Sequence, residues 1–288
     1  MRLAFVSLSS CNGCQVSFLT LLPWLQSRGV EVVAEPFIDG RWRGEEVDVA
    51  VVEGSVSNEE HVRLLKLLRE RAGRIIALGT CAVYGGLQGI RRLTLARETR
   101  HAEPGLPSET TPRPVTEVVE VDAAIPRCPP PINMLAETLA GLLGIGGRPE
   151  KSWISVCSQC RRRMKPIKEL RFRVDFNPAS IDPETCFLSQ GVICLGPVTM
   201  GGCGAHCTKS VPCAGCAGPA LDLILMRGVT PVDKLAHVVS ALSGRSYGEC
   251  RRALEEALHG YLSHTFTSSS QVMLSKPGSR LLAYVSRR

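Results

Sequence analysis

The sequence has 288 residues, of which 44% are hydrophobic and 21% are charged. This length suffices for one large domain or two smaller ones with hydrophobic cores, and the composition excludes a largely disordered chain. No apolar run approaches the ~18–20 residues of a membrane-spanning helix, and the formal net charge of +7 permits an acidic protein or a nucleic acid as partner.

The first half alternates short apolar runs with helical patterns, as α/β proteins do. Strands are expected at Leu3–Leu8, Val30–Ala34, Val47–Val52 and Ile75–Leu78, with Val118–Val121 as a weaker fifth. Helices are expected at Val16–Gln26, His61–Ala72 and Ile132–Leu143. The runs are rich in Val and Ile, which is typical of buried parallel strands. We therefore predict an α/β fold with a mostly parallel, doubly wound sheet.

The second half loses this rhythm. Residues 92–115 are polar and rich in Pro, which predicts a loop, and Gly144–Glu150 is typical of a domain boundary. We expect three parts: a sheet domain at 1–149, a cysteine-rich domain at 150–219 and a helical tail at 220–288. Helices of the tail are expected at Ala220–Met226, Pro231–Leu242 and Gly248–Leu262. The middle part lacks the pattern of a normal core, so we expect bound metal to hold it together.

Thirteen cysteines are the unusual feature of the composition. The first residues predict a strand and no export signal, so we expect the protein to be cytoplasmic. Reducing compartments keep thiols free, which argues against a disulfide framework. The cysteines are therefore candidates for metal ligation.

Four cysteines follow predicted strands. Cys11 and Cys14 come after the first strand, Cys81 after the fourth and Cys128 after the fifth. Doubly wound sheets bind ligands at the carboxyl ends of their strands, so these thiols can form one shell of four thiolate ligands. A structural zinc ion and an iron–sulfur cluster both accept such a shell, and the wide spacing suits a cluster in a folded crevice.

Eight further cysteines lie between residues 150 and 219: Cys157, Cys160, Cys186, Cys194, Cys203, Cys207, Cys213 and Cys216. Together the twelve supply three shells of four thiolates each, and the remaining Cys250 is expected in a helical core. The spacing differs from that of bacterial ferredoxins, so a two-zinc module stays open. Clusters would form an electron-transfer chain, whereas zinc has no redox chemistry.

Several motifs in this order resemble the small subunit of [NiFe]-hydrogenases, from residue 1 to about Pro219. They are Ser10-Cys11-Asn12-Gly13-Cys14, Glu53-Gly54-Ser55, Leu78-Gly79-Thr80-Cys81, Cys128-Pro129-Pro130 and Pro212-Cys213-x-Gly215-Cys216. The resemblance implies a flavodoxin-like parallel sheet domain, then a small irregular iron–sulfur domain and a helical tail. It also implies an oxidoreductase whose Ni–Fe centre lies in a separate large subunit, so no catalytic residue is expected here.

The resemblance further implies three [4Fe–4S] clusters. The proximal cluster would use Cys11, Cys14, Cys81 and Cys128; the distal cluster Cys157, Cys160, Cys186 and Cys194; the medial cluster Cys203, Cys207, Cys213 and Cys216. At the distal site Cys157 replaces the histidine of the better-known periplasmic members, which favours a lower potential. The all-cysteine ligation is most similar to the cytoplasmic, methyl-viologen-reducing group.

Members of that group pass electrons to an iron–sulfur or flavin protein, often a heterodisulfide reductase. Deazaflavin-reducing hydrogenases have similar small subunits and stay open as an alternative. Complex-I-like subunits share the amino-terminal pattern without the two later clusters.

Three other features have both a structural and a functional interpretation. Glu53 is either a strand-end carboxylate satisfied by backbone N–H groups or an ionisable group near the subunit interface. The run from Arg161 to Lys168 is either a solvated face or a positive docking surface for an acidic electron partner. His206 is expected to hydrogen-bond a cluster sulfur or to face solvent.

Two other functions compete with a hydrogenase electron relay. A zinc-rich module that binds nucleic acid would use the positive charge, but aromatic residues are only 5% and offer few stacking platforms for single strands. An isolated ferredoxin-like carrier would leave the large α/β half without a purpose.

Overall fold

The computed structural model describes residues 1–38, 40–86, 112–146, 155–173, 177–226 and 228–258. The chain divides into two compact units. The first unit ends at Glu150 and the second begins at Lys151. Each unit has its own hydrophobic core, so each is described by itself.

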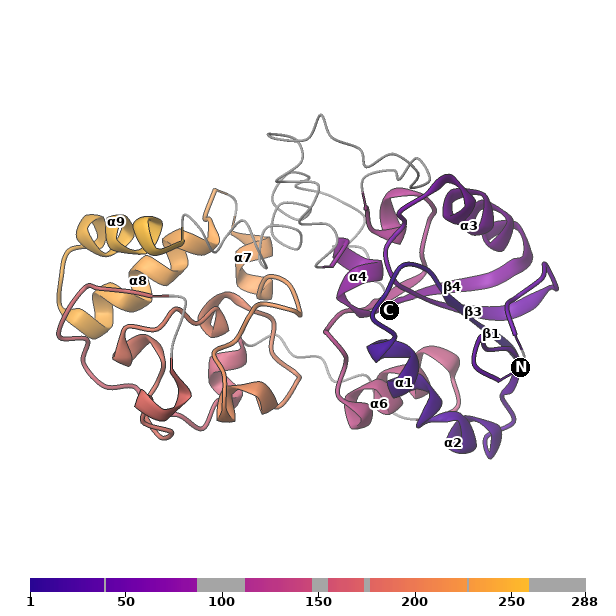
Figure 1. The fold of residues 1–288 in the computed structure, drawn as a ribbon, viewed down its shortest axis with the longest axis horizontal. Coiled ribbons are helices and arrows are strands. Elements are labelled where there is room, and N and C mark those ends of the chain that lie inside the picture. The colour runs from indigo at the N-terminus through magenta and orange to yellow at the C-terminus, as the bar shows by residue number, and fades with distance from the viewer. Residues whose placement is uncertain (39, 87–111, 147–154, 174–176, 227, 259–288) are drawn as a thin grey trace. The chain divides into compact units, whose positions relative to one another are not determined.

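A five-stranded parallel sheet forms the centre of the first unit (Figure 1). Its strands are β1 (Arg2–Ser7), β2 (Glu31–Ala34), β3 (Val47–Glu53), β4 (Ala72–Leu78) and β5 (Ala123–Ile125). They lie in the order β2-β1-β3-β4-β5, which is the order of flavodoxin-like folds. The α/β prediction with a flavodoxin-like sheet is therefore confirmed.

Helices cover both faces of this sheet (Figure 1). The helices of the first unit are α1 (Gly13–Leu19), α2 (Leu22–Gln26), α3 (Glu59–Arg71), α4 (Gly79–Tyr84) and α6 (Ile132–Leu143), with a 3-10 turn, η2, at Val115–Glu117. α1, α2 and α6 share one core with alternate strand residues such as Phe5, Val51 and Leu78. α3 lies on the opposite side (Figure 1). Its N-cap residue is Asn58, whose side chain accepts a hydrogen bond from His61 N at 2.8 Å. These layers leave the carboxyl ends of the strands as one common edge.

The fifth strand and the first helix differ from the prediction. Val118–Val121 was expected to be the strand, but β5 begins at Ala123, because Asp122 sets the pairing with β4. The Asp122 carboxylate accepts from Ile75 N at 2.7 Å, and Asp122 N donates to Ile75 O at 2.8 Å. The single helix expected at Val16–Gln26 is two helices, since Pro23 lacks the N–H that would continue the first one.

The second unit combines irregular loops with helices. Its helices are α7 (Leu221–Leu225), α8 (Pro231–Ser243) and α9 (Tyr247–Leu258). Its short 3-10 turns are η3 (Val156–Gln159), η4 (Pro178–Ser180), η5 (Leu188–Gln190), η6 (Gly196–Val198) and η7 (His206–Lys209). The expectation that residues 150–219 form no normal hydrophobic core is wrong, because α8 and α9 supply apolar faces to it. Phe187, Val192 and Leu195 of the loops share one buried cluster with Leu235 and Leu254 of the helices.

The loop predicted at 92–115 lies mostly outside the described residues, as does the end of the helix predicted at Gly248–Leu262. Where the loop is described, Arg113 pairs with Val56 in an antiparallel bridge. α6 ends at Gly144, within the predicted boundary segment. Among the described residues, no helix has both the length and the apolar character needed to cross a membrane.

Candidate metal centres

Four cysteines lie together at the carboxyl edge of the sheet. This first cysteine group is Cys11, Cys14, Cys81 and Cys128. Burial raises the pKa of the Cys14 thiol, and the charges of Glu53 and the other three cysteines raise it further. Cys11 and Cys128 are exposed, and Cys14 and Cys81 are partly buried. The topology therefore gathers thiols that are separated by up to about 117 residues in the sequence, because β1, β4 and β5 all end at this edge.

Glycines leave room around these sulfur atoms. A Cβ atom at Gly79 would overlap the sulfur of Cys14, and one at Gly86 would overlap the sulfur of Cys81. Both glycines have a positive φ, +84° and +61°, a conformation that side chains disfavour. At Gly13 a Cβ would lie 3.5 Å from the Cys11 sulfur. The backbone therefore approaches the thiols as closely as a group held between them requires.

Glu53 ends β3 beside this group and is 1% exposed. The hydroxyls of Ser7 and Ser10 each donate to its carboxylate at 2.9 Å. Burial raises the pKa of Glu53, and the hydrogen bonds from Ser10, Ser7 and the N–H of Gln15 oppose that rise. The structural interpretation predicted that backbone N–H groups satisfy the Glu53 carboxylate. In the structure, two serine hydroxyls share this role with the N–H of Gln15.

The second cysteine group is Cys157, Cys160, Cys186 and Cys194. All four line one cavity, together with Gly196 and Thr208. Burial raises the pKa of Cys157 to about 12, helped by the charges of Cys186, Cys160 and Cys213. A Cβ at Gly196 would lie 3.1 Å from the Cys157 sulfur and 3.5 Å from the Cys194 sulfur.

The third cysteine group is Cys203, Cys207, Cys213 and Cys216. Burial raises the pKa of Cys207, and Cys216 and Cys203 add to the rise. Cys213 is less clearly part of this group, because its N–H donates to the Cys194 sulfur at 3.3 Å and the charge of Cys194 raises its pKa more than that of Cys216 does. Cys213 therefore lies between the second and third groups.

Each group of thiols has the number of thiolate ligands that an iron–sulfur cluster takes. A zinc ion holds four sulfur ligands at ~2.3 Å. In the part of the chain that the structure describes, no three His, Cys, Asp or Glu side chains converge closely enough to hold one metal ion. Burial raises the pKa of Cys14, Cys157 and Cys207, so a cation nearby would favour the thiolate form of these side chains. All thirteen cysteines are free of disulfides, which leaves these thiols available as ligands.

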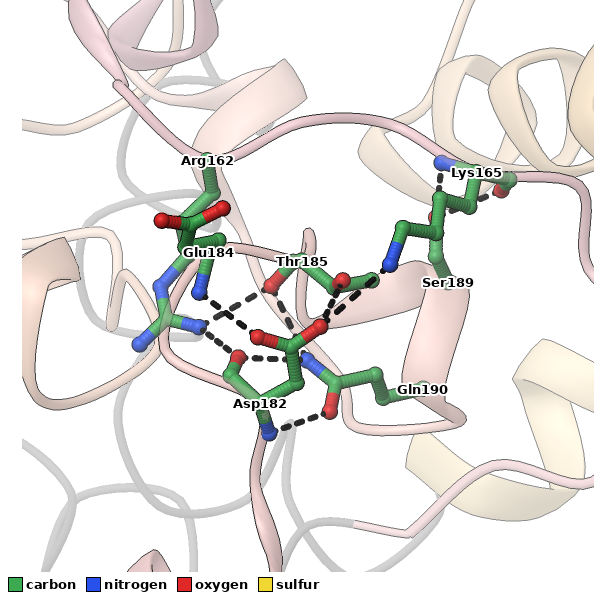
Figure 2. Close-up of polar contacts among 7 residues, drawn as sticks. All are labelled: Arg162, Lys165, Asp182, Glu184, Thr185, Ser189 and Gln190. Carbon is green, nitrogen blue, oxygen red and sulfur yellow. Dashed lines mark hydrogen bonds and ion pairs between the residues drawn. The ribbon is translucent and has the colours of Figure 1, made fainter.

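Two residues connect the later groups, and the sequence assigned this role to neither of them. Arg162 donates from Nε to Thr208 O at 2.6 Å and from Nη1 to the carbonyls of Asp182 and Thr185 at 2.8 and 2.9 Å. Figure 2 shows its side chain turned toward the last two residues. Gln159 Oε1 accepts from Gly202 N at 2.7 Å. In the sequence, the position of Gln159 between the two cysteines of a Cys-x2-Cys motif could have pointed to its role. Nothing distinguished Arg162 from the other basic residues of its run.

The remaining candidates fall as follows. Cys250 is fully buried in the helical core, as expected. His206 is exposed, which agrees with the second of its two predicted roles, a side chain that faces solvent. Thr208, which was not singled out, accepts a hydrogen bond from the Cys160 sulfur at 3.3 Å.

Similar proteins are found for both parts of the chain. The family model described as NADH ubiquinone oxidoreductase, 20 Kd subunit, matches residues 11–142. A subunit of the F420-non-reducing hydrogenase vhu of Methanocaldococcus jannaschii is 33% identical over 260 residues, covering 84% of this chain and 89% of the relative. The gamma subunit of the coenzyme F420 hydrogenase of Methanosarcina barkeri is 29% identical, covering 72% of this chain and 75% of that relative.

A solved structure has a similar fold along most of the chain. It is the actinobacterial-type NiFe-hydrogenase from Ralstonia eutropha H16, with a TM-score of 0.54 and 19% identity. The likeness covers 91% of this chain and 90% of that one.

Proposed function

This chain belongs to the family of [NiFe]-hydrogenase small subunits, and from that membership we propose that it relays electrons through three [4Fe–4S] clusters. The small subunit is the electron-transfer component of an oxidoreductase whose catalytic site lies in the large subunit. Each cluster supplies one-electron chemistry. This chain's own residues hold the clusters, set their surroundings and shape the surfaces on which partners dock.

The gathering of twelve thiols into three groups carries the proposal. The first group would hold the proximal cluster, the second group the distal cluster and the third group the medial cluster. The cradle of Gly79 and Gly86 around the sulfurs of Cys14 and Cys81 supports the first assignment. The cavity that all four thiols of the second group line supports the second. Division of the last two groups depends on Cys213, which contacts Cys194 and belongs by resemblance with Cys216.

A large subunit is the partner proposed for the first unit. Its cysteine group is open, since Cys11 and Cys128 are exposed. Three apolar side chains nearby are also more than half exposed: Val16 at 58%, Phe37 at 57% and Ile38 at 60%. The carboxylate of Glu35 links their segments, because it accepts from the side chain of Gln15 and from Phe37 N. An exposed cysteine group beside exposed apolar side chains is typical of a face that another subunit covers.

The proposed acceptor is an iron–sulfur or flavin protein, with heterodisulfide reductase as one example. The more similar relative is named F420-non-reducing, and the F420 hydrogenase relative is less similar. This difference favours a protein acceptor over the deazaflavin alternative. We place the complex in the cytoplasm, where free thiols persist.

Metal analysis of anaerobically purified protein tests the proposal. We expect about twelve irons per chain with a matching amount of sulfide, because each [4Fe–4S] cluster contains four of each. Reduction with dithionite should then produce paramagnetic signals. Zinc without sulfide would instead support the zinc-rich module that binds nucleic acid.

A further inference from the structure

Positive charge is concentrated in one short segment of the second unit. Residues 161–173 contain seven Lys or Arg residues and a single Glu, in a chain whose net charge is +7. The segment follows directly after Cys160 of the second cysteine group. The structure separates residues of this segment that hold the loops together from residues that face solvent.

Arg162 and Lys165 have internal partners. The guanidinium of Arg162 also donates to Lys209 O at 3.1 Å and lies 3.9 Å from the centre of the Phe187 ring. The ammonium of Lys165 lies 3.3 Å from the carboxylate of Asp182 (Figure 2). Hydrogen bonds from Thr185 and from Glu184 N, together with Lys165, hold the pKa of Asp182 at about 2, so this carboxylate stays charged. Both side chains therefore already have partners within the chain.

Arg161, Arg163 and Lys209 are different. All three are exposed, and none is joined to a carboxylate among the ion pairs of the described residues. They line one groove of about 370 Å³, together with the exposed His206 and one acidic residue, Glu184. We call it the basic groove. Its cations have no internal task, so their charge is directed to solvent.

The loops that carry the later cysteines line part of the basic groove. Gln159 lies between Cys157 and Cys160, and Gly204 lies between Cys203 and Cys207; both line the groove. Gln159 Oε1 accepts from Gly204 N at 3.2 Å, which joins the two loops. A protein seated in the groove would therefore contact ligand loops of both the second and the third cysteine groups.

We propose that the basic groove is the docking site for an acidic electron-accepting protein. This inference rests on the proposed function, because it places the acceptor beside the clusters of the second unit. Complementary charge speeds the encounter of two proteins and orients them. No Phe, Tyr or Trp side chain is among the described residues that line the groove, which disfavours single-stranded nucleic acid as its occupant.

Charge reversal in the assembled hydrogenase tests the docking site. The probe is a small acidic ferredoxin, and the variant is Arg161→Glu combined with Lys209→Glu. We expect the dissociation constant of the ferredoxin complex with this variant, at low salt, to be about tenfold higher or more than with the wild type. Electrostatic steering changes association rates by 10–10³. The matched control is Arg245→Glu with Arg252→Glu. It makes the same change in net charge at two exposed positions that do not line the groove. It should shift the constant less than about twofold, because salt screens charges that do not face the docked protein.

Iron content and thermal midpoint of the groove variant should equal those of the wild type. If the reversed variant does not assemble, Arg161→Gln with Lys209→Gln gives a smaller change of the same sign. For the wild type, binding should weaken steeply as salt rises. Equal loss of ferredoxin binding in the groove and control variants would overturn the docking site. Binding of duplex DNA is measured on the same proteins. A groove variant that loses DNA binding and keeps ferredoxin binding would also overturn it.

Failure of the docking site is distinguishable from failure of the proposed function. Wild-type hydrogenase that contains its iron and reduces a small uncharged quinone with hydrogen, yet binds the ferredoxin with no dependence on salt, retains the function and lacks the docking site. Protein without iron and sulfide would remove both.

Discussion

At the scale of single residues, the glycines beside the first cysteine group have a steric role that a composition count does not reveal. Gly79 combines a positive φ with a sulfur atom where a Cβ would lie. Gly29 has nearly the same φ, +77° against +84°, but nothing lies within 4 Å of its Cβ position. Substitutions at the two positions therefore distinguish the effect of backbone strain, common to both, from the effect of crowding at the first cysteine group, which only Gly79 has.

We predict that Gly79→Ala loses the iron of the first group, about four atoms per chain, because its methyl group displaces the Cys14 sulfur. Gly29→Ala has the same backbone strain, about 1–2 kcal/mol, and should keep its iron. Iron and sulfide analysis of both variants is the measurement. Equal iron contents would show that the cradle is not needed.

Arg162 and Arg161 form a second matched pair. Arg162→Met removes four hydrogen bonds to carbonyl groups, and we expect it to lower the free energy of unfolding by about 2–4 kcal/mol. Arg161→Met should leave this free energy within about 0.5 kcal/mol, because surface changes away from such contacts have little effect. Denaturant unfolding of anaerobic protein measures both. Similar midpoints for the two variants would contradict the internal role of Arg162.

The positions of the cysteines could be predicted from the sequence, whereas their surroundings could not. Spacing placed Cys11, Cys14, Cys81 and Cys128 after strands, and the parallel topology brings those strand ends together. Arg162 was hidden because three adjacent arginines have the same pattern, and only the path of the loops decides which one turns inward.

At the scale of elements, apolar runs were sufficient for β1 to β4 and for α3 and α6. β5 was misplaced, because Ala123–Ile125 has weaker strand propensity than the valines before it and is positioned by the Asp122 side chain. α4 was missed, since Gly79–Tyr84 is a six-residue helix without an apolar stripe or a side-chain cap. Short elements held by tertiary contacts lie beyond local pattern.

The start of α8 makes stability depend on pH. Asp233 accepts from Thr230 N at 2.8 Å and from the Tyr247 hydroxyl of α9 at 2.7 Å. Burial acts to raise its pKa, but the hydrogen bonds from Tyr247 and Thr230 and the charge of Arg251 hold it at about 2. Because an unfolded aspartate has a pKa of about 3.9, the charged carboxylate stabilises the fold above about pH 4, and this stability is lost as the pH falls toward 2.

We therefore predict that Asp233→Asn lowers the unfolding midpoint at pH 7 and that its difference from the wild type shrinks between about pH 4 and pH 2. Asp222→Asn is the control. It breaks the ion pair between Asp222 and Lys234, and the carboxylate of Asp222 is half exposed. Its difference from the wild type should stay small throughout. A constant difference for Asp233→Asn at every pH would rule out the linkage.

At the scale of the whole molecule, the two units have separate cores, whereas the second and third cysteine groups share one. Arg162 joins the carbonyl before Cys186 to the carbonyls after Cys207. Cys213 N donates to the sulfur of Cys194. Loss of one group in the second unit should therefore disturb the other, and the first group should be indifferent to both.

Two single substitutions measure this difference. Cys81→Ser should remove about four of about twelve irons and leave the second unit loaded, since its loops and core do not use Cys81. Cys186→Ser should remove more than four irons, approaching eight, because its loop is bonded through Arg162 to the loop that carries Cys207. Iron and sulfide per chain, with paramagnetic spectra after dithionite, distinguish the outcomes. A loss of about four irons in both variants would mean that the three groups bind metal independently and that the contacts between the later loops do not couple them.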